Sequence, residues 1–161
     1  MDQLTHLDEQ GRLCMVDVGD KPTTRRRAVA AATLVVGPAV AQLLREGKTP
    51  KGNALEAARL AGVLAAKRTF ELIPLCHQVV LDHVEVDCSV EEDRVHIRAE
   101  ASAWGKTGVE MEALTAAAVA GLTLYDMLKA LGRGMVLQEV RLLRKEGGRT
   151  GVWTAEGFHD R

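Results

Sequence analysis

The segment of residues 80–104 constrains the fold of this chain more than any other. It alternates apolar and polar residues in two runs, "VLDHVEVDCSV" and "DRVHIRAEASAW", which meet at the acidic turn Glu91-Glu92-Asp93. A period of two is typical of strands with one buried face, and two such runs joined by a short turn predict an antiparallel hairpin. The chain is therefore expected to form a sheet that is antiparallel at this point.

The other apolar patterns predict the elements around this hairpin. In chain order they are a strand over residues 26–36, helices over 38–47 and 54–68, a long helix over 108–134 and a last strand over 135–148. Asn53 is placed to cap the second helix, and the long helix has acids in its first turn, where the helix dipole favours them. Glycine at position 134 predicts the end of that helix.

The resulting order is strand, two helices, two strands, helix, strand. This order matches the split βαβ or ferredoxin-like plan, an α+β fold in which helices cover one face of an antiparallel sheet. A length of 161 residues fits one domain spanning residues 1–161. Some strand positions on both faces are apolar, so a partner subunit is expected on the face that the helices leave open.

Composition excludes several classes of protein. Aromatic residues make up 3% of the chain and the net charge is −1, which argues against a nucleic-acid binder. The three cysteines, Cys14, Cys76 and Cys88, have no CxxC spacing, so neither a disulfide framework nor a structural zinc site is expected. No signal peptide and no apolar run of membrane-spanning length is found, which predicts a soluble, cytoplasmic protein.

Two segments around the predicted long helix carry groups suited to chemistry. Asp126, Lys129 and Arg133 lie along one side of the helix, either as a solvated stripe of charges or as groups that move protons and bind an anion. The segment "WGKTGVEME" joins a strand to the helix N-terminus, where backbone N–H groups attract anions. A true phosphate loop would need glycine where Glu100 stands, so that interpretation is disfavoured.

The basic loops and the Cys76-His77 pair complete the candidates. Lys51 lies beside a glycine just before a helix, and Lys21, Arg25, Arg26 and Arg27 gather before the first strand. Most such residues only add solubility, but loop positions allow several of them to converge on one triphosphate-like ligand. Cys76 is better interpreted as a small buried apolar residue than as a nucleophile. His77, just after Pro74, is the better functional candidate.

Seven motifs occur together and in order along the chain: "LTHL", "MVDVG", "KGN", "AARLAGVLAAKRT", "LIPLCH", "GKTGVEMEALTAA" and "LYDMLKA". In this combination the sequence resembles the cyclic pyranopterin monophosphate synthases of molybdenum cofactor biosynthesis, from Leu4 to about Trp153. One departure is Gln78, which stands where members of the family usually have proline after "LCH".

The resemblance implies roles for individual residues. Lys51, Asp126 and Lys129 correspond to the catalytic groups, and the substrate-binding residues would be Leu75, Cys76, His77, Glu110, Met111, Glu112 and Arg26. His77 would hydrogen-bond or charge-pair with substrate, and Cys76 would shape the pocket. The implied activity is that of a lyase, which converts 3′,8-cyclo-7,8-dihydroguanosine 5′-triphosphate to cyclic pyranopterin monophosphate with release of diphosphate, by acid/base ring rearrangement and phosphate cyclisation.

The same resemblance implies an assembly and a place in a pathway. The expected state is a homohexamer, a trimer of dimers with active sites at the dimer interfaces, acting after a radical-SAM GTP cyclase. No resident cofactor or metal is expected, apart from Mg²⁺ carried by the substrate triphosphate. Two alternatives stay open: a ferredoxin-like module that binds a small ligand without turnover, and a nucleotide hydrolase that uses "GKT".

Overall fold

The computed structural model describes residues 6–160. The chain forms β1 (Thr24–Val35), α1 (Pro38–Arg45), α2 (Ala54–Lys67), α3 (Thr69–Leu72), β2 (His83–Val90), β3 (Arg94–Gly105), α4 (Glu110–Leu128), β4 (Val136–Glu146) and β5 (Val152–Thr154). The predicted cap of α2 is confirmed, because the Asn53 side chain accepts a hydrogen bond from the Glu56 backbone N–H at 3.1 Å.

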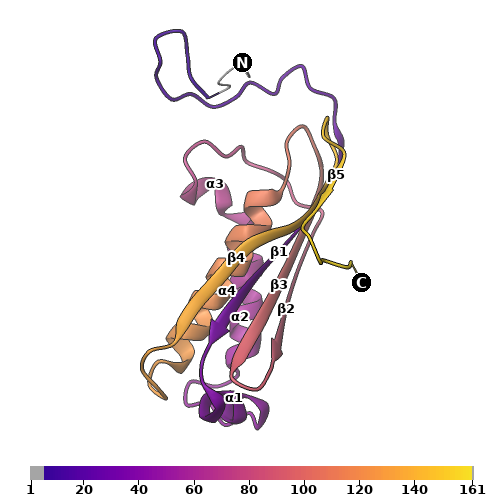
Figure 1. Ribbon diagram of the computed structural model, residues 1–161. Helices are drawn as coiled ribbons and strands as arrows, with labels where there is room; N and C mark the ends of the chain where they lie inside the picture. Colours follow the sequence, from indigo (N-terminus) through magenta and orange to yellow (C-terminus); the bar gives the residue numbers. More distant parts are fainter. Residues whose placement is uncertain (1–5, 161) are drawn as a thin grey trace.

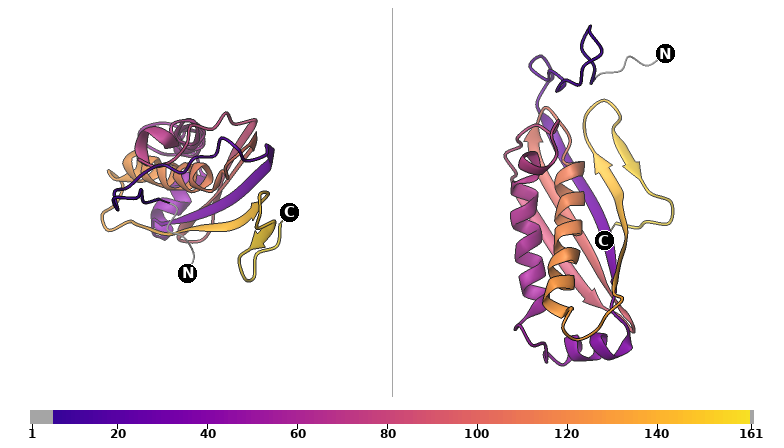
Figure 2. Two further views of the ribbon diagram at one scale, coloured as in Figure 1. Left: turned by 90° about the horizontal axis from the view of Figure 1, so that it is seen from above. Right: turned by 90° about the vertical axis from the view of Figure 1, so that its left-hand side faces the viewer.

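The five strands form one antiparallel sheet in the order β2-β3-β1-β4-β5. The long helices α2 and α4 lie side by side on one face of this sheet (Figure 1; Figure 2). The order is that of the split βαβ plan with one short strand added at the β4 edge. The expected α+β fold, with an antiparallel sheet covered by helices on one face, is confirmed.

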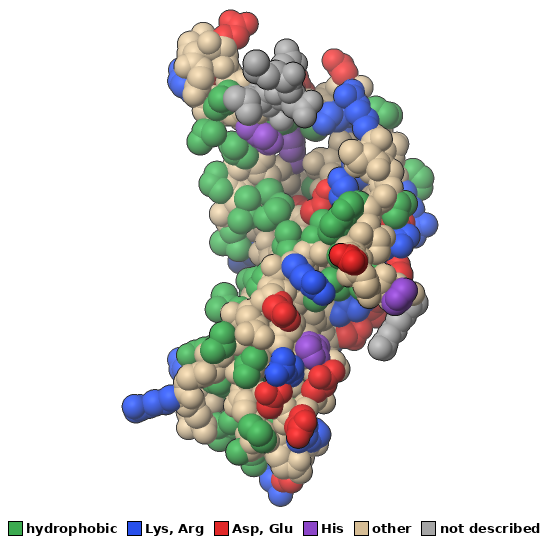
Figure 3. Space-filling model, in the orientation of Figure 1, with side chains coloured by type: hydrophobic (Ala, Val, Ile, Leu, Met, Phe, Trp, Pro, Cys, Tyr) green, Lys and Arg blue, Asp and Glu red, His purple; other side chains and the backbone are tan. Residues whose placement is uncertain are grey.

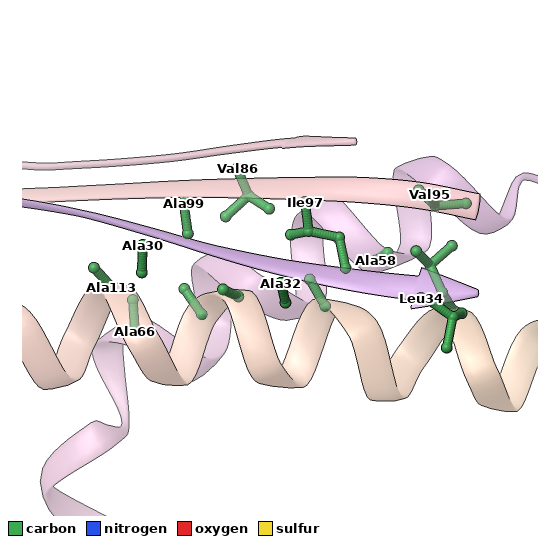
Figure 4. Close-up of a cluster of buried hydrophobic side chains, with 14 of the residues drawn as sticks. Ala30, Ala32, Leu34, Ala58, Ala66, Val86, Val95, Ile97, Ala99 and Ala113 are labelled. Carbon is green, nitrogen blue, oxygen red and sulfur yellow. The ribbon is translucent and has the colours of Figure 1, made fainter. Parts of the chain in front are cut away.

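The core between sheet and helices is built from small side chains. Ala30, Ala32 and Ala99 on the strands and Ala113 on α4 point into it and are completely or almost completely buried (Figure 4). Short side chains allow close approach of helices and sheet. At Gly121 of α4, an added Cβ would lie 2.5 Å from a methyl carbon of Leu137, so alanine there would force the Leu137 side chain to shift.

The other face of the sheet carries charged side chains beside a few apolar ones. On β1, Arg27 and Val29 point to the face opposite the core alanines. Arg27 donates hydrogen bonds to Glu100, Glu146 and Asp160 at 2.6–3.1 Å. Asp160 brings the C-terminal segment to this network. The open face is therefore polar near the start of β1, with the segment of residues 157–160 folded back toward it.

Three parts of the chain differ from the sequence-based predictions. The helix predicted over residues 108–134 ends at Leu128, because the chain turns there through a Leu131 N–H to Leu128 O hydrogen bond and reaches Gly134 at a φ of 82°. The prediction that Arg133 shares the helix with Asp126 and Lys129 is therefore wrong. The short elements α3 and β5 were not predicted, since three or four residues carry no periodic pattern.

Helix α4 is long and apolar enough to resemble a membrane span by length and composition. Its buried residues face the sheet and α2, however, and its outer side carries Asp126 near the end. These are the properties of the central helix of a folded core.

Candidate active site

A cavity of about 470 Å³ lies at the N-terminal end of α4. It is walled by the N-terminal segment, the loop after α3 and the first turn of α4, through His6, Val16, Val18, Lys21, Leu75, Cys76, His77, Val79, Thr107, Gly108, Glu110, Met111 and Glu112. Six of the seven substrate-binding residues predicted from the sequence are among them, and Arg26 lies in an adjoining pocket. The structure thus brings the "LCH" and "EME" segments together, although about 30 residues separate them in the chain.

Two carboxylates of this cavity differ in environment. Glu112 is 4% exposed, and burial, with a smaller contribution from the negative charge of Glu110, raises the pKa of its side chain to about 7. Glu110 is more exposed and lies 3.6 Å from the ammonium of Lys145. The cavity therefore holds one carboxyl that binds or releases a proton near neutrality and one that is paired with a cation.

Replacing Glu112 with glutamine is expected to stabilise the protein at alkaline pH. The folded state binds a proton on Glu112 that the unfolded state releases, so stability is lost as the pH rises from about 4.5 to 7. Glu112→Gln should raise the free energy of unfolding by about 3 kcal/mol at pH 8 and change it little at pH 4. Urea unfolding at both pH values measures this, with Glu110→Gln as the control; an equal effect at both pH values would contradict it.

Cys76 and His77 have different surroundings. Burial and the nearby charge of Glu112 raise the pKa of the Cys76 thiol, which disfavours the thiolate that a nucleophile needs. His77 Nε2 lies 2.7 Å from the backbone oxygen of Val16. Because a carbonyl only accepts, the histidine donates, and its Nε2 must carry the proton. The other ring nitrogen of His77, Nδ1, takes no part in this hydrogen bond.

Cys76→Ala is expected to keep substantial activity. A thiol whose pKa is raised lends little nucleophilicity, so kcat/KM should fall by less than about tenfold through the change in pocket shape alone. Steady-state kinetics on the purified variant measures this. A variant that is folded and assembled but has no turnover would restore the nucleophile interpretation.

A cationic pocket of about 380 Å³ adjoins the cavity and shares Lys21, Thr107 and Gly108 with it. Its basic residues are Lys21, Arg26, Lys106, Lys145 and Arg149. Within the described residues, Arg26 Nε and the Thr24 hydroxyl are buried without a hydrogen-bond partner, which is costly unless a ligand satisfies them. The pocket is suited to an anion with several negative charges, such as a polyphosphate.

Sequence reasoning missed part of this pocket. Lys145 lies near the end of β4 and Arg149 in the turn that follows it. No pattern in the sequence of that strand distinguishes them from solvent-exposed charges. The signal was the pair Gly147-Gly148, with φ angles of 102° and 73°, because a Cβ at either position would collide with Arg26 or its neighbour's backbone. Lys106 of "GKT" lines the pocket but also donates to the backbone oxygen of Gly19.

The three predicted catalytic residues meet at the other end of α4. Asp126 Oδ1 lies 2.6 Å from Lys129 Nζ, and Asp126 Oδ2 lies 3.0 Å from Lys51 Nζ, which also donates to the Asp126 backbone oxygen at 3.0 Å. Hydrogen bonds from Lys129 and then Lys51 lower the pKa of Asp126, and Asp126 raises the pKa of Lys129. All three side chains are solvent-accessible in the single chain.

The position of Asp126 is unusual for a carboxylate. The C-terminal turn of a helix carries a partial negative charge, which repels acids, and the gain from exposed ion pairs is small. Local stability therefore does not explain why an acid is held between two lysines there. Proton exchange between a carboxylate and two ammonium groups would explain the arrangement better.

The two groups of site residues lie at opposite ends of one helix. Glu112 and Asp126 are 14 positions apart, which corresponds to about 20 Å along the axis of α4. A side chain cannot bridge that distance. The Lys51–Asp126–Lys129 cluster and the cavity of the same chain therefore do not form one site.

The described residues form a ferredoxin-like α+β fold with a cationic pocket, a carboxylate-lined cavity and a lysine–aspartate–lysine cluster. Residues 15–148 match the MoaC family. The cyclic pyranopterin monophosphate synthases of Thermomicrobium roseum and Methylobacterium nodulans are 53% and 54% identical to this chain over 158 residues, which is 97% of it and 95% and 99% of theirs. The chain belongs to the MoaC family.

A human relative has a different length. Molybdenum cofactor biosynthesis protein 1 of Homo sapiens is 54% identical over 152 residues, which is 93% of this chain but 24% of the human protein. The resemblance inferred from the seven sequence motifs is confirmed by these matches.

Proposed function

We propose that this chain converts 3′,8-cyclo-7,8-dihydroguanosine 5′-triphosphate to cyclic pyranopterin monophosphate and diphosphate, as a lyase of molybdenum cofactor biosynthesis. The observation that carries the proposal is the cationic pocket with its unpartnered Arg26, directly beside a cavity lined by Glu110 and Glu112. The names of the relatives agree with it, and membership in the family confirms the expectation of an enzyme of this pathway.

The two pockets match the two halves of that substrate. Carboxylates accept hydrogen bonds from the N–H groups of a guanine-derived ring, and Glu110 and Glu112 supply them in the cavity. Lysine and arginine bind phosphates and stabilise the charge that builds on a leaving diphosphate. Arg26, Lys21 and Lys145 are suited to this in the adjoining pocket.

The chemistry needs protons moved at several atoms while the ring opens and a pterin forms. Asp126 gives one acceptor, and Lys51 and Lys129 give two donors that each lie within 3.0 Å of it. No redox step is involved, so we propose no resident cofactor. Mg²⁺ would accompany the triphosphate, because this hard cation prefers oxygen ligands such as those of substrate phosphates.

We further propose that the complete site forms between two copies of the chain, within a homohexamer arranged as a trimer of dimers. If α4 packs antiparallel to α4 of a second copy, the Lys51 end of one lies against the Glu112 end of the other. Exposed Leu60, Leu64, Leu122 and Tyr125 on the outer side of α2 and α4 supply apolar surface for such a contact. Apolar side chains are visible along this helix side in Figure 3.

The proposal also places the enzyme in the cytoplasm, after a radical-SAM GTP cyclase that supplies its substrate. The test is incubation of purified protein with 3′,8-cyclo-7,8-dihydroguanosine triphosphate, followed by measurement of diphosphate and of the oxidised pterin. Both products should appear together, and Lys51→Ala should abolish both without changing fold or assembly. Binding without products would contradict the synthase and favour a ligand-binding module.

A further inference from the structure

The segment of residues 14–22, here called the N-terminal strap, forms a wall of the substrate cavity without belonging to any helix or strand. Its side chains alternate in exposure: Val16 and Val18 are half-buried toward the cavity, whereas Met15, Asp17 and Gly19 are exposed. Figure 1 shows the chain before β1 running above the top of the sheet and helices. The strap therefore needs specific contacts to stay over the cavity.

Two side chains from separate loops supply these contacts. His77 Nε2 donates to the backbone oxygen of Val16 at 2.7 Å, from the loop after α3. Lys106 Nζ donates to the backbone oxygen of Gly19, from the loop between β3 and α4. The two acceptors are three residues apart, so both donors hold the same short piece of chain.

Bonds within the strap fix its shape between those two points. Asp17 accepts a hydrogen bond from the Gly19 backbone N–H at 2.7 Å, and the Lys21 N–H donates to the Val18 backbone oxygen at 3.1 Å. The resulting turn carries Lys21 into the boundary between the cavity and the cationic pocket, both of which it lines. Displacement of the strap would remove this cation from both.

We propose that His77 and Lys106 are positioning residues, which hold the N-terminal strap closed over the cavity and thereby place Lys21 for the substrate phosphates. His77 acts in this way through the backbone oxygen of Val16. Lys106 acts through Gly19 rather than as the lysine of a phosphate loop. The kinetic consequence rests on the proposed function, whereas the effect on the strap does not.

Hydrogen exchange of the strap tests the structural half without substrate. Loss of one donor removes one hydrogen bond, and the net contribution of such a bond corresponds to about a tenfold change in the equilibrium constant for local opening. His77→Ala and Lys106→Met should each increase exchange about tenfold in peptides covering residues 14–22, measured on the full-length assembled protein. His77→Gln, which keeps an N–H near the Nε2 position, should restore protection, and His83→Ala on exposed β2 should change nothing.

The kinetic half separates positioning from catalysis. His77→Ala should raise KM about tenfold with a smaller change in kcat, and His77→Gln should recover most of the KM. Unchanged exchange in His77→Ala would overturn the proposal whatever the activity. So would a His77→Gln variant with full strap protection and no turnover, because His77 would then act on substrate directly. If the unaltered protein has no synthase activity, the hydrogen-exchange result still decides whether His77 and Lys106 hold the strap in place.

Discussion

Two inactive variants of this chain, mixed in equal amounts and reassembled, are expected to recover about a quarter of the activity of the unaltered enzyme. One variant is Lys51→Ala, which removes a proposed catalytic group at the C-terminal end of α4. The other combines Glu110→Ala with Glu112→Ala at the N-terminal end. Alone, each should lose at least about a thousandfold in kcat/KM, as expected when an acid–base group or the ring-binding carboxylates are removed.

The reason for recovery is the separation of about 20 Å between the two ends of α4. If each site takes its lysine cluster from one copy and its cavity from the other, a mixed dimer has one site with both defects and one with none. Random pairing makes half of the dimers mixed, so about one site in four is intact. Activity measured after denaturation and refolding of the mixture tests this, and native mass spectrometry confirms that mixed assemblies form.

A matched mixture provides the control. Lys51→Ala and Asp126→Ala lie at the same end of the helix, so every site of a mixed dimer contains one of them. This mixture should stay inactive. Equal recovery in both mixtures, or mixed assemblies without recovery in the first, would show that the site is not shared as proposed.

Arg27→Met is expected to destabilise the protein, with a loss of about 2–3 kcal/mol in the free energy of unfolding. The Arg27 side chain is 15% exposed and donates to carboxylates from β3, β4 and the C-terminal segment, namely Glu100, Glu146 and Asp160. Methionine would fill similar space but leave three neighbouring negative charges without their shared partner. Arg98 and Arg144, which contact the same carboxylates, limit the loss.

Thermal unfolding at a fixed protein concentration measures this effect, since assembly contributes to apparent stability. The melting temperature should fall by about 5–10 °C at pH 7. Arg25→Met, at the neighbouring exposed position, should change it little. An Arg27→Met protein that melts with the unaltered one would show that the network adds no stability.

The pH dependence gives a second measure of the same network. Hydrogen bonds from arginine lower the pKa of Glu100, Glu146 and Asp160, with Arg27 as the main cause at Glu100 and Asp160. Lowered carboxyl pKa values mean that the stabilisation is present above the unfolded pKa values near 4 and is lost as the pH falls through the folded ones. The difference between Arg27→Met and the unaltered protein should therefore shrink below pH 4.

Most of the fold could be predicted from local patterns because its elements are long and periodic. The hairpin of β2 and β3, the Asn53 cap and the order of elements were all visible in the sequence, and the structure agrees with them. The sequence predicts an end of α4 six residues too late, since apolar and basic residues continue past Leu128 and only the tertiary turn decides where the helix stops. The ion-pair network on the outer face of the sheet was also not predicted, because alternation alone does not say which polar residues pair.

The sequence by itself determined which residues are suited to chemistry and which family they resemble. Its motifs mark Lys51, Asp126 and Lys129 as one predicted group and His77 and Glu112 as another, although the members of each group are brought together only by the fold. Only the tertiary structure decided that these two groups lie at opposite ends of α4, and that Lys145 joins Arg26 in one pocket. The physical reason is that helix length and strand pairing set distances between residues, and no single segment of sequence contains them.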